Sequence, residues 1–73
     1  MTDIQDIQKK AQQVADMVVG MSEKAALRIA DTMDLRLRVL TRDDKHYVVT
    51  RDLRADRVNV RIANGEIYEA KVG

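Results

Sequence analysis

Apolar side chains recur at alternating spacings of three and four residues along the first part of the chain, which is the spacing of one helix face. The positions are Ile4, Ile7, Ala11, Val14, Val18 and Met21. They predict a helix over residues 3–19, with Asp3 and Asp6 favouring its N-terminal end and Gly20 its stop. Because the stripe also fits a heptad pattern, two interpretations stay open: an arm packed on its own domain, and a helix that self-associates or binds a partner.

A second helix is predicted shortly afterwards. Ser22 is a typical N-cap, and Glu23 places a negative charge in the first turn, where it suits the helix dipole. The pattern ends near Thr32 or Met33 and is broken by Asp34. The apolar positions are Ala25, Ala26, Leu27, Ile29, Ala30 and Met33. They indicate a buried helix, which we take as the main helix of the domain.

The second half of the chain alternates apolar and charged side chains, which is the period of half-buried strands. One strand covers residues 35–39 and is followed by a polar connection at residues 41–45, and another covers residues 57–62. Asn64-Gly65 is a strong signal for a type I′ hairpin turn, so residues 66–72 form the returning strand. The expected fold class is α+β, with one main helix packed on a small mixed sheet, plus an extra N-terminal helix.

The segment between these strands, residues 48–58, is predicted to be a long extended loop. Its apolar spacing does not support a helix, and it contains no Gly or Pro that would make a tight turn. Arginines and aspartates alternate along it, so they are the candidates for keeping it ordered. A loop held extended by its own charges is suited to presenting a backbone segment to a partner.

Composition narrows the function classes. The chain has 73 residues, which indicates one domain with a small core, and it lacks cysteine, so no disulfide or cysteine metal site is expected. A single histidine does not favour a zinc site, and no cofactor is predicted. The N-terminal residues lack the features of a signal peptide, and the longest apolar run, residues 17–19, is too short to span a membrane. The cellular location stays open, with the cytoplasm as one candidate.

The inventory of reactive side chains does not favour an enzyme. His46 is the only histidine, and the hydroxyls of Thr41 and Thr50 have no evident second orienting partner for nucleophilic catalysis. Asp43 and Asp44 are adjacent in an extended segment, where their side chains point in opposite directions, so they are interpreted as a solvated turn. The three glycines are too scattered for a phosphate-binding loop.

Nucleic-acid binding is also not predicted. The net charge is only +1, and Tyr47 and Tyr68 are the only aromatic residues, which leaves a weak base-stacking platform. Acidic residues are interleaved with the arginines of the second half. Those arginines are Arg36, Arg38, Arg51, Arg54, Arg57 and Arg61.

The loop carries a resemblance to a known family. Residues 48–58, VVTRDLRADRV, resemble the reactive-site segment of the potato inhibitor I family of serine protease inhibitors, which includes the barley chymotrypsin inhibitor and eglin. Residues 18–26, VVGMSEKAA, are similar to the family's entry into its helix, and the chain ends in Val-Gly as many members do. Residues 56–60, DRVNV, followed by Asn64-Gly65-Glu66-Ile67, are closer to small microbial relatives of these inhibitors. The resemblance covers residues 17–73 and implies an inhibitor-like domain at 20–73, preceded by a helix or arm at 1–19.

The resemblance implies roles for individual residues. Arg51 falls on the primary specificity position, so the bond offered to a protease is Arg51–Asp52, and a trypsin-like or subtilisin-like serine protease is the expected partner. Thr50 and Asp52 flank that bond, and Arg57 matches one of the arginines that support them by charge-assisted hydrogen bonds. The reactive-site residues implied in this way are Val49, Thr50, Arg51, Asp52 and Leu53.

The sequence departs from the family at several positions. Asn59 stands where the plant inhibitors carry a second supporting arginine, so Arg54 and Arg61 are the candidates to replace it. Leu53 replaces the family's aromatic residue beyond the bond. The alternative to inhibition is an inhibitor-like scaffold that binds another protein through the loop or the N-terminal helix. In that case the arginines and aspartates form ordinary exposed ion pairs.

Overall fold

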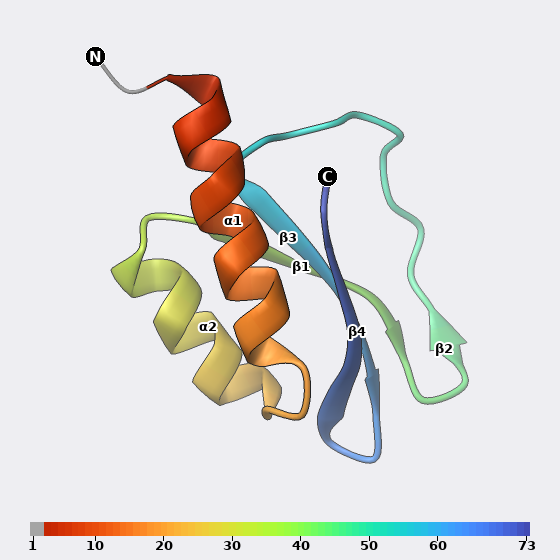
Figure 1. The fold of residues 1–73 in the computed structure, drawn as a ribbon. Coiled ribbons are helices and arrows are strands. Elements are labelled where there is room, and N and C mark those ends of the chain that lie inside the picture. Colours follow the sequence, from red (N-terminus) through yellow and green to blue (C-terminus); the bar gives the residue numbers. More distant parts are fainter. Residues whose placement is uncertain (1–2) are drawn as a thin grey trace.

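The computed structural model describes residues 3–73 and contains both predicted helices (Figure 1). Helix α1 spans Ile4–Val18 and helix α2 spans Glu23–Thr32. The side chain of Asp3 accepts a hydrogen bond from the Gln5 amide, and Ser22 accepts one from the Ala25 amide at 3.2 Å, so each helix begins at a side-chain cap. Residues 1 and 2 of the expected N-terminal arm lie outside the described residues.

The strands form one mixed sheet in the order β2-β1-β3-β4. Their bounds are Arg36–Arg42 for β1, Lys45–His46 for β2, Arg57–Ala63 for β3 and Glu66–Val72 for β4. Strands β1 and β3 are parallel neighbours, whereas β2 and β4 pair antiparallel with them at the edges. Both helices lie on one face of this sheet (Figure 1), which confirms the α+β fold class predicted from the sequence.

The two tight turns have different chemistry. Asn64 and Gly65 both have positive φ, at 52° and 80°, as a type I′ turn requires. The segment expected to be a polar connection at residues 41–45 is instead a second hairpin, in which β1 continues to Arg42 and returns as β2. Its turn contains no glycine; Asp43 takes a positive φ of 54°, and its carboxylate accepts a hydrogen bond from the Asn64 amide at 2.8 Å. The sequence pattern around residues 41–45 does not indicate this hairpin, because its turn is held by a contact with a residue far along the chain.

Helix α1 shares the hydrophobic core of the sheet. The core side chains are aliphatic and come from both helices, the α2–β1 connection and strands β3 and β4: Ala11, Val14, Ala15 and Val18 of α1, Ala26 and Ala30 of α2, with Leu35, Val58, Val60, Ile62 and Ile67. The face of α1 from Ala11 to Val18 is therefore covered and is not available for self-association. In the described part of the chain, no helix has the length and apolar character needed to cross a membrane.

Candidate functional site

The segment Tyr47 to Asp56 contains no helix or strand and connects the edge strand β2 to the central strand β3. It arches over the end of the molecule at which the N-terminus of α1 and the end of β4 lie (Figure 1). Its two ends are fixed by backbone hydrogen bonds, from the Tyr47 amide to Leu40 at 3.0 Å and from the Arg36 amide to Asp56 at 2.8 Å. The loop is therefore extended but anchored at both ends.

Several side chains of residues 48–53, in the middle of the loop, are exposed to solvent. Val48 is fully exposed to solvent and Leu53 is 90% exposed, while Val49 and Arg51 are also exposed. No ion pair holds Arg51 among residues 3–73. This long cationic side chain is thus free to enter a pocket of another molecule.

The residues on either side of Arg51 are joined to each other. The Thr50 hydroxyl donates a short hydrogen bond to the Asp52 carboxylate, which closes a bridge across the intervening residue. Because both side chains turn toward each other and toward the sheet, Arg51 is left on the outer side. The bridge joins side chains two residues apart, which lie on the same side of the backbone in an extended segment.

Arg57 binds the Asp52 end of this bridge from the sheet. This residue begins β3 and is almost buried, at 8% exposure. Its Nη2 donates to the Asp52 carbonyl oxygen at 2.9 Å and to the carboxylate at 3.3 Å, while Nη1 lies 3.4 Å from the other carboxylate oxygen. Its Nε donates to the main-chain oxygen of Gly73 at 2.9 Å, so the guanidinium itself is held in place. These contacts tie the start of β3 to Asp52, and the supporting role that the resemblance implies for Arg57 stays a prediction.

Arg38 holds the Thr50 side, and sequence reasoning did not identify it. Its Nη1 lies 3.4 Å from the Thr50 carbonyl oxygen, 3.3 Å from the Thr50 hydroxyl and 3.7 Å from the Asp52 carboxylate. Its Nε donates to Asn59 Oδ1 at 2.8 Å. Arg38 lies opposite Asn59 in the parallel pairing of β1 with β3, which places the guanidinium under the loop. The only signal in the sequence was an arginine on the polar face of the first strand.

The other expected supports bond elsewhere. Arg54 donates to the Asp56 carboxylate at 2.9 and 3.2 Å, and Arg61 lies 3.3 Å from Glu69. Neither makes a hydrogen bond to residues 49–53 within the described residues, so the expectation that one of them replaces the missing arginine is corrected. Asn59 does not reach the loop, but it links Arg38 to the main-chain oxygen of Gly73 by a 3.1 Å bond. Because the same Gly73 oxygen also accepts from Arg57, Asn59 connects the two arginines through a chain of hydrogen bonds.

The carboxylates of the loop are kept ionised. The pKa of Asp52 is lowered from 3.8 to about 2, first by the hydrogen bond from the Thr50 hydroxyl and then by that from Arg57. The pKa of Asp56 is lowered mainly by its hydrogen bonds from Arg54. Because Asp52 stays negative at neutral and mildly acidic pH, its bonds to the arginines persist over that range.

The site contains an accessible peptide segment and its supports rather than reactive groups. Within residues 3–73, no group of three or more His, Cys, Asp or Glu side chains is placed to hold a metal ion. The Thr50 hydroxyl is bonded to a carboxylate, and the only histidine, His46, lies in the edge strand β2. Chemically, the arrangement can hold one exposed backbone segment in an extended form for recognition by another protein.

Comparison with known proteins gave one informative result. No family model and no curated protein matches the chain. Among solved structures, the elastase inhibitor AFUEI matches with a TM-score of 0.62 and 25% sequence identity, over 97% of this chain and 100% of that one. The structure is similar to a protease inhibitor. The match includes α1, which lay largely outside the resemblance seen in the sequence, whereas membership of the potato inhibitor I family stays a prediction.

The neighbour also bears on the class of protein. It is an inhibitor rather than an enzyme, which supports the expectation of a non-enzymatic protein that binds a protease. The loop and its supports lie in a chain whose fold corresponds to that inhibitor over nearly its whole length.

Proposed function

We propose that this protein inhibits serine proteases in the manner of a substrate, by presenting the Arg51–Asp52 bond to the enzyme. The observation that carries the proposal is the bracing on both sides of this bond. Arg38 contacts Thr50 on the acyl side, and Arg57 contacts Asp52 on the leaving side. Both arginines project from the two neighbouring central strands of the sheet, so the bond is supported from the hydrogen-bonded centre of the fold.

The physical basis of inhibition would be preorganisation. A loop that is already extended loses little conformational entropy on binding and docks with little change of shape. If the protease cleaves the bond, the two new ends belong to segments that different arginines still hold. The new amine at Asp52 then stays close to the acyl group on Arg51, so the bond can re-form instead of the acyl-enzyme being hydrolysed.

The specificity residue would be Arg51, whose exposed cationic side chain suits an acidic primary pocket of the trypsin type. The structural neighbour is an elastase inhibitor, and elastase pockets accept small side chains. We therefore expect the native chain to inhibit trypsin, and the Arg51→Ala variant to lose trypsin inhibition and to gain inhibition of elastase. Such an exchange shows that residue 51 occupies the primary pocket without disturbing the rest of the loop.

The test is a titration of trypsin, subtilisin and elastase with the native protein and with Arg51→Ala, combined with mass spectrometry of the products. Stoichiometric, long-lived inhibition with slow cleavage after Arg51 supports the proposal. Rapid, complete cleavage after Arg51 without lasting inhibition would instead identify the loop as a substrate. Absence of both binding and cleavage would favour the alternative, an inhibitor-like scaffold whose loop serves a different protein.

A further inference from the structure

The apolar stripe of α1 extends beyond the hydrophobic core. On this stripe Ala11, Val14, Ala15 and Val18 are buried, whereas Ile7 is only partly covered and Ile4 keeps 66% of its surface exposed. Residues at these spacings lie on the same face of the helix. The first two turns of α1 therefore carry two isoleucines that the core does not need for its packing, and they lie at the end of the molecule where the loop is found (Figure 1).

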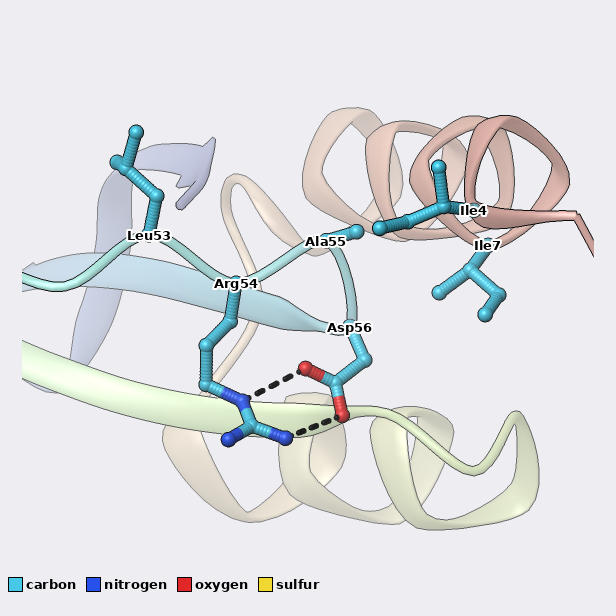
Figure 2. Close-up of a pocket in the computed structure, with 6 residues that line it drawn as sticks. All are labelled: Ile4, Ile7, Leu53, Arg54, Ala55 and Asp56. Carbon is cyan, nitrogen blue, oxygen red and sulfur yellow. Dashed lines mark hydrogen bonds and ion pairs between the residues drawn. The ribbon is translucent and has the colours of Figure 1, made fainter.

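These isoleucines lie opposite residues 53–56, the part of the loop that leads into β3. An open groove of about 320 Å³ lies between them and the segment that follows the proposed reactive bond. In Figure 2, Ile4 points toward Ala55, and Leu53 projects away from the loop backbone into open space. The residues lining the groove are Ile4, Ile7, Leu53, Arg54, Ala55 and Asp56.

The charges at the groove are already paired with each other. Arg54 donates two hydrogen bonds to the Asp56 carboxylate, and its guanidinium is turned toward that partner rather than toward Ile4 (Figure 2). What the groove offers is mainly aliphatic surface, from Ile4 and Ile7 of the helix and from Leu53 and Ala55 of the loop. A phosphate or a strongly charged peptide finds no unpaired charge among these lining residues, whereas an apolar side chain finds complementary surface.

The position of Leu53 identifies the molecule that would cover the groove. Leu53 is the second residue after the Arg51–Asp52 bond, so an enzyme that takes this bond into its active site must also lie over Leu53. We infer that the groove between α1 and residues 53–56 is a secondary contact surface for the inhibited protease, and that it receives an apolar side chain from the enzyme's leaving-group side. The inference rests on the proposed inhibitory function.

The experiment compares two variants of α1 that carry the same change in charge. Ile4→Glu places a carboxylate in the groove, whereas Gln8→Glu places one on an exposed part of the helix beside Lys9 and Gln12. Inhibition constants are measured for trypsin and subtilisin with the full chain, and thermal unfolding confirms that both variants fold. Preventing the burial of an isoleucine that is exposed to this extent weakens binding roughly tenfold. We therefore expect Ile4→Glu to raise the inhibition constant about tenfold. Gln8→Glu is expected to match the native chain.

Hydrogen exchange of the native complex gives an independent reading. Amides in residues 4–8 should exchange more slowly when the protease is bound, together with those of the loop. If the native chain inhibits but Ile4→Glu inhibits equally well and residues 4–8 show no added protection, the groove inference is wrong and the proposed function stands. If Ile4→Glu abolishes only a concentration-dependent dimer in sedimentation, the occupant is a second copy and the inference is again wrong. If the native chain inhibits no protease, both proposals fail.

Discussion

The support from Arg38 leads to a prediction about the lifetime of inhibition. In the Arg38→Ala variant, Thr50 loses both contacts from the β1 guanidinium, while Arg57 and its bonds to Asp52 remain. The acyl side of the Arg51–Asp52 bond would then be held only through the Thr50–Asp52 hydrogen bond, whereas the leaving side keeps its direct support from Arg57. We expect weaker inhibition of trypsin and faster cleavage after Arg51.

The size of the effect follows from the contacts. The two bonds from Arg38 to Thr50, at 3.3 and 3.4 Å, are long, so together they contribute about 1 kcal/mol at an exposed site. The 2.8 Å bond to Asn59 is shorter and adds about 1 kcal/mol at most to the ordering of the guanidinium. A total of about 1–2 kcal/mol corresponds to roughly a 5- to 30-fold increase in the inhibition constant.

Arg61→Ala is the matched control. Arg61 lies on the neighbouring strand β3, its side chain is 37% exposed, and it pairs with Glu69 rather than with the loop. Inhibition constants from steady-state assays and the rate of cleavage by mass spectrometry are measured for both variants. Arg38→Lys keeps the charge but cannot reach Asn59 and Thr50 through separate nitrogens, so it should recover only part of the loss. Equal inhibition and equal cleavage rates for Arg38→Ala and Arg61→Ala would refute the reasoning.

Two further predictions concern pH and the β1–β2 turn. Because folding lowers the pKa of Asp52 from 3.8 to about 2, its stabilising contribution is complete above pH 3.8 and is lost as the pH falls toward 2. A carboxyl-carbon NMR titration of Asp52 should therefore give a midpoint near pH 2, and a midpoint near 4 would contradict the bridge. Asp43→Ala should lower the free energy of unfolding by about 1–3 kcal/mol, because it removes the bond to the Asn64 amide and puts alanine at positive φ. Asp43→Gly should lose less in the same urea titration, since glycine accepts that backbone.

The fold was largely predictable because its signals are local. The helix caps at Asp3 and Ser22 and the Asn64-Gly65 turn depend on side chains within a few residues of the backbone they control. The hairpin at Asp43 was missed for the opposite reason. Its turn is held by a hydrogen bond to the amide of Asn64, a residue 21 positions away, and no local pattern encodes that contact. The sequence therefore predicted a polar connection where the chain in fact forms a second hairpin.

The supports of the loop show the same limit at the site itself. Arg57 could be assigned because it belongs to the same continuous segment as Thr50 and Asp52. Arg38 could not, because its role depends on β1 lying parallel to β3 with Arg38 opposite Asn59, and register between distant strands is not visible in a single sequence. The sequence alone indicates a missing support at Asn59, yet this side chain accepts a 2.8 Å hydrogen bond from Arg38 of the adjacent strand and so orients that guanidinium. The guanidinium that contacts Thr50 thus comes from Arg38 in β1, the strand beside β3. A departure from a family motif at one position of a strand therefore has to be judged together with the residue opposite it in the neighbouring strand.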